Sequence, residues 1–271
     1  MKFSCSNIAW TKEQEPISLS ILKKYNITGI EVAPTILWPN WENATVDNAI
    51  LYKKTLSDQG FEIPAMQAIM FGKNVTSIFD KTDQINILSH LAMVSDLAGA
   101  LGAKSIVFGS PKLRNTNLSI NDAITEVVPF FHKIASYFNN NGSCFCIEPC
   151  GEIYGSNFIT SAHEAAILSK EVNSSGFGIH IDSAALHEAE EIIDNVWDEI
   201  KHNVKHYHIS EPQLNNFHNS IIPHLHNLNW LQEHNYQGWC SVEMKNSSIP
   251  LTDRGPWDII TYYRNAVKIN T

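Results

Sequence analysis

Residues 204–212 read VKHYHISEP. The β-branched and aromatic residues of this stretch are typical of a buried strand. Because successive side chains along a strand point to opposite faces, His206 and His208 lie on the same face. A lone buried histidine is usually a hydrogen-bonded core residue. Two on one face, followed by Ser-Glu-Pro where the strand ends, favour a functional site, with His208 near the strand end and His206 one layer deeper.

Seven other segments have a similar strand-like composition, and segments with helical periodicity separate them. The eight predicted strands are 3–9, 29–34, 62–70, 104–110, 143–149, 176–182, 204–210 and 239–244. Regular alternation of strands and helices indicates β-α units and a parallel sheet. Eight such units in 271 residues fit a closed (β/α)8 TIM barrel of the α/β class, which usually needs about 250 residues. We therefore predict a single TIM-barrel domain over residues 1–271.

Helix-end signals support this division of the chain. Asn26 and Gly60 are predicted to end the first two helices, and Thr160 or Ser161 is a predicted N-cap. Thr82-Asp83 is expected to start the third helix, and Leu101-Gly102 to end it. The first predicted strand is not followed by a G-x-G-x-x-G turn, which argues against an open dinucleotide-binding sheet.

The composition excludes several classes of function. The net charge of −9 argues against a nucleic-acid partner, because such binding needs a basic face that neutralises phosphates. No run approaches the roughly 20 apolar residues of a membrane span, and the amino-terminal residues lack a secretion signal. The five cysteines are expected to be reduced thiols. We therefore expect a cytoplasmic protein without a membrane or nucleic-acid partner.

Polar residues occupy the ends of the last four predicted strands. They are Glu148 in CIEP, Asp182 in IHID, His208 in HYHIS and Glu243 in SVEM. The carboxyl ends of the strands in a parallel barrel meet at one face, so these four side chains should converge. Carboxylate and imidazole groups suit Mn²⁺, Mg²⁺, Co²⁺ or Zn²⁺. The sequence therefore predicts one divalent metal ion held by these four residues.

Across its whole length the chain resembles the xylose-isomerase-like barrels of the sugar phosphate isomerase/epimerase superfamily, which includes ketose 3-epimerases, hydroxypyruvate isomerase and relatives with the endonuclease IV fold. The resemblance is carried by SNIAW, GIEVAPT, VFGSPKLRN, HIDSAALH, HYHISEP and GWCSVEM, and above all by the ordered Glu, Asp, His, Glu set. It implies a metal site at those four positions. It also implies that Glu148 and Glu243 act as the catalytic acid and base.

The chain departs from its relatives at other positions. Ketose 3-epimerases have a substrate-binding histidine where this chain has Ala185, and an arginine where it has Leu214. The extra histidines with which endonuclease IV relatives hold three zinc ions are also missing; Gln67, for instance, stands on the third strand. The resemblance therefore leaves the substrate open, and nuclease activity is not expected.

Several further residues are candidates for substrate binding. Lys112 and Arg114 follow the fourth strand, where they could grip a carboxylate or phosphate; the alternative is a solvated basic loop. The other candidates near the predicted mouth are Trp10, Glu31, Trp38, Gln67, Glu152, Tyr154, Asn157 and His187. The alternatives are core packing or a dimer contact for the tryptophans, loop capping for residues 152–157, and surface exposure for His187. His218, His224, His226 and His234 are assigned no role.

The sequence thus predicts a metal-dependent isomerase or epimerase that acts on a sugar, a sugar phosphate or a related polyol derivative. Chelation of a carbonyl and its neighbouring hydroxyl by the metal would stabilise an enediolate, while two carboxylates remove and return the proton. One alternative is an inosose-type dehydratase, which would expel water with the same metal and base. Another is a non-catalytic, metal-containing barrel that only binds sugar. The oligomeric state, including a homo-oligomer, stays open.

Overall fold

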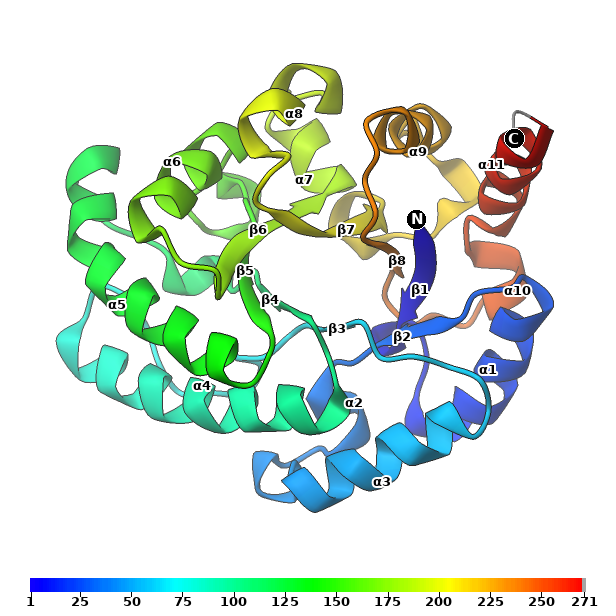
Figure 1. Ribbon diagram of the computed structural model, residues 1–271, viewed down its shortest axis with the longest axis horizontal. Coiled ribbons are helices and arrows are strands. Elements are labelled where there is room, and N and C mark those ends of the chain that lie inside the picture. The colour runs from blue at the N-terminus through cyan, green and yellow to red at the C-terminus, as the bar shows by residue number, and fades with distance from the viewer. Residues whose placement is uncertain (270–271) are drawn as a thin grey trace.

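A computed structural model describes residues 1–269 and confirms the predicted (β/α)8 barrel. Its strands form one parallel sheet in the order β2-β1-β8-β7-β6-β5-β4-β3. They are β1 (Lys2–Ser6), β2 (Gly29–Glu31), β3 (Ala65–Met66), β4 (Ser105–Phe108), β5 (Cys144–Ile147), β6 (Phe177–Asp182), β7 (Val204–Ser210) and β8 (Trp239–Glu243). Figure 1 shows these strands in the centre of the molecule, with the helices around them.

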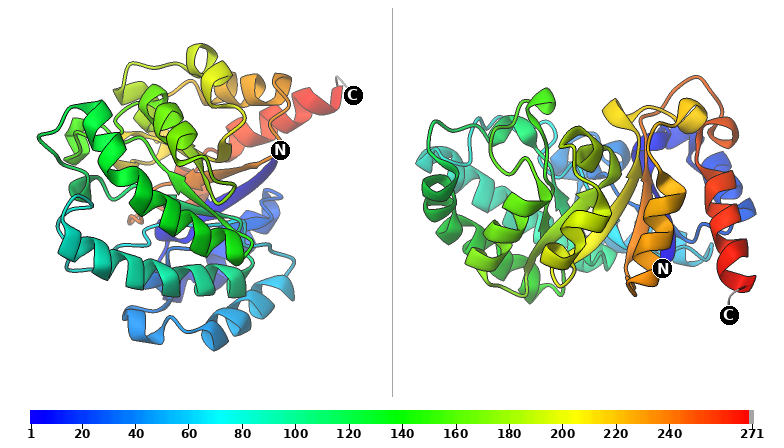
Figure 2. Two further views of the ribbon diagram at one scale, coloured as in Figure 1. Left: turned by 60° about the vertical axis from the view of Figure 1, so that its left-hand side comes forward. Right: turned by 90° about the horizontal axis from the view of Figure 1, so that it is seen from above.

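The helices alternate with the strands as the sequence predicts. They are α1 (Glu15–Lys24), α2 (Pro34–Leu37), α3 (Val46–Ser57), α4 (Lys81–Leu101), α5 (Ile120–Asn140), α6 (Ala162–Val172), α7 (Ser183–Glu188), α8 (Ile193–Ile200), α9 (His224–Glu233), α10 (Leu251–Arg254) and α11 (Trp257–Ile269). The two views of Figure 2 show that the helices lie outside the ring of strands. Within residues 1–269, no helix combines the length and the apolar character that crossing a membrane requires.

Closure of the barrel depends on its shortest strands. Two isolated parallel bridges, Gly29 to Glu62 and Val32 to Met66, join the β2 segment to the β3 segment. The predicted strand 62–70 shortens to two residues, because Ala68 adopts a positive φ of 53° that ends the extended conformation. The eight strands therefore enclose an interior.

Most of the predicted helix ends are confirmed. Asn26 and Gly60 have positive φ angles after α1 and α3, and Gly102 ends α4 in the left-handed conformation. Of the two candidate caps of α6, Ser161 accepts the backbone N–H of Glu164 at 3.2 Å. The start of α4 differs slightly from expectation, because Asp80 caps the helix ahead of Thr82-Asp83.

The two faces of the sheet have different characters. On the outer face, Phe131 of α5 packs against Phe145 of β5 and Phe177 of β6, with ring centroids 6.1 and 5.4 Å away. Between β6 and β7, the register pairs His180 with His206 and Asp182 with His208. These four polar residues are buried. The apolar core thus lies between the sheet and the helices, while the barrel interior carries titratable groups.

Gly176, just before β6, provides a test of the contact between sheet and helix. A Cβ there would collide with the backbone of Ala135 and lie 2.8 Å from the Cβ of Asn139, both in α5. We expect Gly176→Ala to lower the free energy of unfolding by about 1–3 kcal/mol, the usual cost of overpacking. In Gly151→Ala the new Cβ has no neighbour within 4 Å, so this variant is the matched control. Urea unfolding should show a lower midpoint for the first variant alone; equal midpoints would contradict this packing.

Candidate functional site

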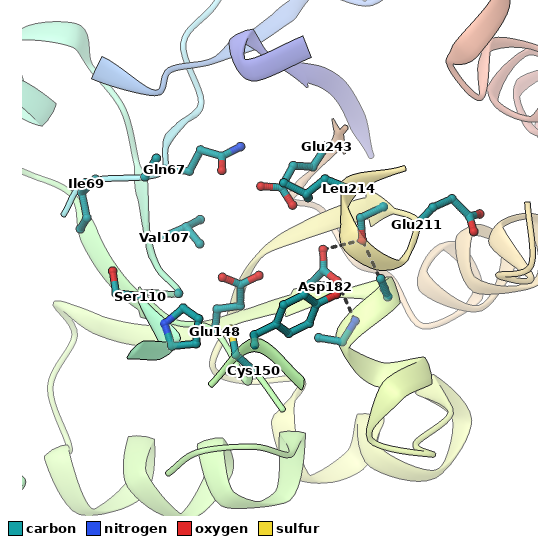
Figure 3. Close-up of a pocket in the computed structure, with 17 residues that line it drawn as sticks. Gln67, Ile69, Val107, Ser110, Glu148, Cys150, Asp182, Glu211, Leu214 and Glu243 are labelled. Carbon is teal, nitrogen blue, oxygen red and sulfur yellow. Dashed lines mark hydrogen bonds between the residues drawn. The ribbon is translucent and has the colours of Figure 1, made fainter. Parts of the chain in front are cut away.

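A pocket lies at the carboxyl ends of the strands, with a cavity of about 230 Å³. Every strand from β3 to β8 contributes to its wall, either directly or through the segment that follows it (Figure 3). The residues that line it are Gln67, Ala68, Ile69, Val107, Gly109, Ser110, Pro111, Glu148, Cys150, Tyr154, Asp182, Ala184, Ala185, Ser210, Glu211, Leu214 and Glu243. This is the end of the barrel at which TIM-barrel enzymes carry their active sites.

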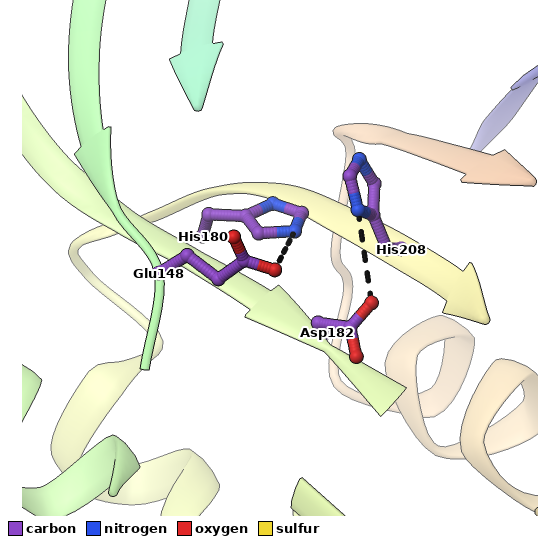
Figure 4. A group of neighbouring side chains, drawn as sticks. All are labelled: Glu148, His180, Asp182 and His208. Carbon is purple, nitrogen blue, oxygen red and sulfur yellow. Dashed lines mark ion pairs between the residues drawn. The ribbon is translucent and has the colours of Figure 1, made fainter. Parts of the chain in front are cut away.

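The four residues predicted to hold a metal lie close together. His208 Nδ1 is 3.2 Å from a carboxylate oxygen of Glu243 and 3.7 Å from one of Asp182. Glu148 and Asp182 each offer a carboxylate oxygen within 4.8 Å of this imidazole and of each other. Figure 4 shows two of these carboxylates and His208 pointing toward one another. The arrangement gathers three carboxylates and one imidazole in a small, largely buried volume.

Glu31 fixes the orientation of the His208 imidazole through the ring nitrogen Nε2. Both carboxylate oxygens of Glu31 lie 3.0 Å from His208 Nε2, and neither side chain is exposed by more than 1%. When Nε2–H donates to Glu31, the lone pair of Nδ1 points at the carboxylates of Asp182 and Glu243. Burial acts to raise the pKa of Glu31, but the imidazoles of His208 and His206 hold it well below its usual range. A carboxylate behind a histidine is the arrangement that orients metal-binding imidazoles in proteins.

Asp182 is held rigidly in the same cluster. One carboxylate oxygen accepts the backbone N–H of Ala185 at 2.7 Å, which caps α7, and the other accepts the hydroxyl of Ser210 at 2.5 Å. Ser210 also accepts the backbone N–H of Ala184. These bonds tie the end of β7 to the start of α7 and fix the direction of the carboxylate.

The donor set fits a divalent cation. Burial, and then the charges of Asp182 and Glu243, raise the pKa of Glu148 to about 8. Burial and the charge of Glu243 likewise raise the pKa of Asp182 to about 6. His208 Nδ1 is buried and has no hydrogen-bond partner among the described residues. A cation at this point would relieve the repulsion between the carboxylates and give the imidazole nitrogen a partner.

The sequence analysis missed His180. This residue of β6 is fully buried, its ring centroid is 4.0 Å from that of His208, and neither of its ring nitrogens has a hydrogen-bond partner among residues 1–269. It also offers a nitrogen within 4.8 Å of the ligand atoms of Glu148, Asp182 and His208. The signal was present in the sequence, because His180 and Asp182 are two residues apart on a strand and so share a face, as His206 and His208 do.

A sequence model of the xylose isomerase-like TIM barrel family matches residues 19–262. The chain belongs to this family. A search of curated protein sequences finds no match.

Several solved structures have the same fold. 3-Keto-D-glucoside 4-epimerase from E. coli superimposes with a TM-score of 0.78 at 17% identity, over 98% of this chain and 99% of its own. L-Ribulose 3-epimerase superimposes with a TM-score of 0.77 at 13% identity, over 99% of this chain and 94% of its own. D-Psicose 3-epimerase from Clostridium cellulolyticum H10 superimposes with a TM-score of 0.75 at 14% identity, over 99% of this chain and 92% of its own. At these identities the likeness shows a shared fold, in agreement with the family.

Two of the predicted substrate-binding residues line the pocket. Gln67 lies on the β3 side, and its amide nitrogen donates to the hydroxyl of Ser6 at 2.5 Å. Tyr154 also lines the pocket. Its hydroxyl donates to Glu188 at 3.1 Å and accepts the backbone N–H of Gln213 at 3.2 Å.

The structure does not bring the other candidates to the pocket. Lys112, Glu152, Asn157 and His187 are exposed and lie outside the set of lining residues. Asn157 is used in the loop itself, where its side chain bonds both backbone groups of Thr116.

The three bulkiest candidates are taken up by packing. Arg114 is fully buried behind the wall, and its guanidinium donates to the backbone carbonyl of Ile159. Trp10 is buried in the hydrophobic core, and Trp38 packs against Tyr52 with ring centroids 6.2 Å apart. Neither of the two predicted cations is among the residues that line the pocket, because Arg114 is buried and Lys112 is exposed.

Glu211 was not predicted as a site residue, yet it lines the pocket and fastens the segment that follows β7. Its carboxylate accepts hydrogen bonds from Ser220 Oγ at 2.5 Å, from the backbone N–H of Ile221 at 3.1 Å and from His224 Nε2 at 2.7 Å. His224, to which no role was assigned, is buried at 2% exposure and forms part of this cluster. We call residues 212–223, closed in this way by Glu211, the β7–α9 loop.

The contact between Glu31 and His208 makes metal affinity depend on a residue outside the pocket. Glu31→Gln keeps the shape of the side chain but weakens the hydrogen bond that orients the imidazole. We expect divalent metal to bind about 10–100-fold more weakly, the usual effect of losing such a partner. Isothermal titration with Mn²⁺ measures this. Glu62→Gln, which alters an exposed ion pair with Lys2, is the control and should bind as the wild type does; equal affinity in both variants would contradict the role of Glu31.

The raised pKa values of Glu148 and Asp182 predict how pH affects the metal-free protein. Their pKa values are about 8 and about 6, against ordinary values of 4.5 and 3.8, so the folded state binds more protons than the unfolded state in this range. These two carboxyl groups therefore make the folded state less stable as pH rises from about 4 to 8. Saturating Mn²⁺ should remove most of this loss, so the gap in Tm between loaded and EDTA-treated protein should widen from pH 5 to pH 8. Glu148→Gln should remove part of this pH-dependent loss from the metal-free profile, and an unchanged profile in that variant would refute the assignment.

Proposed function

We propose that this protein is a divalent-metal-dependent sugar isomerase or epimerase, which moves a proton on a carbon next to a carbonyl group. The observation that carries the proposal is the cluster of Glu148, Asp182, His208 and Glu243 at the carboxyl end of the barrel, with His208 Nδ1 free to bind a cation. Solved structures with the same fold bear the names of sugar epimerases. The family and the site thus support the same chemistry.

In this proposal the four residues hold one Mn²⁺, Mg²⁺, Co²⁺ or Zn²⁺ ion. When bound, the ion would polarise the substrate carbonyl and acidify the neighbouring C–H bond. Asp182 and His208 are ligands whose directions are fixed by Ser210 and Glu31. His180 is available as a further nitrogen ligand, which would favour a transition metal over Mg²⁺.

Glu148 and Glu243 then exchange the proton. They extend from β5 and β8 into the same pocket, so a substrate between them presents a different face to each carboxylate. One carboxylate removes the proton from carbon and the other returns a proton, which inverts the centre or moves the carbonyl. The apolar side chains of Ile69, Val107 and Leu214 exclude water from this region.

The test is proton exchange with the solvent. Mn²⁺-loaded protein in D₂O should introduce deuterium next to the carbonyl of a ketohexose such as D-psicose or D-fructose. Glu148→Gln and Glu243→Gln, compared at saturating metal, should exchange about 10²-fold more slowly or worse, the usual cost of losing a general base. Glu152→Gln, on the exposed segment just after the pocket, is the matched control and should keep the wild-type rate.

The same experiment separates the alternatives. An isomerase or epimerase conserves the mass of the substrate apart from deuterium, whereas an inosose-type dehydratase loses one water. A barrel that only binds sugar would show saturable binding without exchange. Wild-type exchange rates in fully loaded Glu148→Gln and Glu243→Gln would rule out both glutamates as bases.

A further inference from the structure

The chemical character of the pocket walls limits which substrate can bind; the walls are the lining residues other than Glu148, Asp182 and Glu243. We propose that the substrate is an uncharged compound of monosaccharide size that places a deoxygenated or alkylated carbon against the walls, such as a deoxy sugar, and that it is not a sugar phosphate or a sugar acid. This inference rests on the proposed function for the reacting centre. The charges, the apolar surfaces and the hydrogen bonds of the walls carry the rest.

The charge of the pocket excludes an anionic substrate. Four carboxyl groups line it, from Glu148, Asp182, Glu211 and Glu243, and no lysine, arginine or histidine does so within the described chain. A divalent cation would neutralise two of these charges. A phosphate or carboxylate group placed away from that cation would meet the remaining carboxylates in a partly desolvated site, and no lysine or arginine side chain lines the described pocket to compensate it.

The backbone N–H groups at the start of α7 are not available to bind an anionic group in place of a cationic side chain. The N-terminal N–H groups of a helix are a common anion site in proteins. Here the N–H of Ala184 is donated to the hydroxyl of Ser210 and that of Ala185 to the carboxylate of Asp182. Both donors that face the pocket at this helix are therefore already used inside the protein.

Apolar groups cover both sides of the carboxylate centre. Figure 3 shows Leu214 beside Glu243 on one side, and Ile69 and Val107 on the other side near Gln67. Ala184, Ala185 and Pro111 extend these apolar surfaces. A sugar hydroxyl buried against such carbon atoms would lose its hydrogen bonds to water without replacement.

The polar side chains of the walls are mostly engaged with the protein. The hydroxyl of Tyr154 has two partners, Ser210 donates to Asp182, and Glu211 accepts three hydrogen bonds. Among the side-chain oxygens of the uncharged wall residues within residues 1–269, the carboxamide oxygen of Gln67 and the hydroxyl of Ser110 have no hydrogen-bond partner. The walls can therefore satisfy few hydroxyls beyond those at the reacting carbons.

The size of the cavity sets an upper limit on the substrate. A volume of about 230 Å³ is below the roughly 300–1,000 Å³ of pockets for drug-sized ligands. One monosaccharide with a short apolar substituent is compatible with this volume, whereas an oligosaccharide could enter only with one terminal unit.

The test compares ketohexoses that differ at a single carbon. Binding of D-psicose and D-fructose, of their 6-deoxy analogues and of their 6-phosphates to Mn²⁺-loaded protein is measured by isothermal titration. The 6-deoxy sugars should bind roughly 10–100-fold more tightly than the parent sugars, the discrimination expected when an apolar pocket takes an apolar group. The 6-phosphates should bind more weakly than the parents.

A variant of the wall provides the second measurement. Leu214→Arg places a cation beside the centre, so the 6-phosphate should gain at least about tenfold in affinity while the 6-deoxy sugar loses affinity. Leu118→Arg, at a position that is 44% exposed and outside the pocket, is the matched control and should leave the order of affinities unchanged. The wild-type series decides the question even if the Leu214 variant fails to fold.

Each outcome has one meaning. Deoxy sugars that bind no more tightly than the parent sugars, or phosphates that bind more tightly than the parents, overturn the inference. The order of affinities is read from binding and not from product formation, so it can be compared whether or not the protein turns the sugars over. If the deoxy sugars bind in the expected order but exchange no proton in D₂O, the substrate inference stands and the proposed function fails.

Discussion

Burial of carboxylates and imidazoles inside a closed barrel is tolerable only when these groups compensate one another. Glu31 on β2 lies 177 positions from its partner His208 on β7, and the curved sheet brings the two within 3.0 Å. Two short bridges beside β2 complete the ring that makes this possible. The orientation of the imidazole, the direction of its free nitrogen and the gathering of the carboxylates around it all follow from closure.

Most of the architecture could be predicted from the sequence, because hydrophobic periodicity and strand-end residues are local signals. The order of the strands and the convergence of Glu148, Asp182 and His208 belong to this class, as does the approach of Glu243 to His208. The locations of Arg114 and Trp10 could not be predicted in this way, since loop position alone does not tell a solvated side chain from one folded back into the core. Strand ends determine where the carboxylates converge, whereas the walls depend on how each loop packs.

The proposed metal centre and the walls of the pocket therefore depend on different parts of the fold. The proposed metal ligands and bases extend from strands whose backbones are fixed by the sheet, and hydrogen bonds restrain Asp182 and His208 further. Many of the wall residues lie on loops or at the first turn of α7. Relatives with less than a fifth of their residues in common keep this barrel over nearly its full length.

The fastening of the β7–α9 loop by Glu211 has an evolutionary consequence. One carboxylate anchors the far end of the loop through Ser220, Ile221 and His224, and these hydrogen bonds do not involve the side chain of Leu214. Under the proposed function, mutations at this position would alter which compounds are accepted without changing the proposed metal ligands or the sheet. Substitutions at a few positions of the β7–α9 loop would then change the substrate preference during evolution, while the proposed metal-dependent reaction stayed the same.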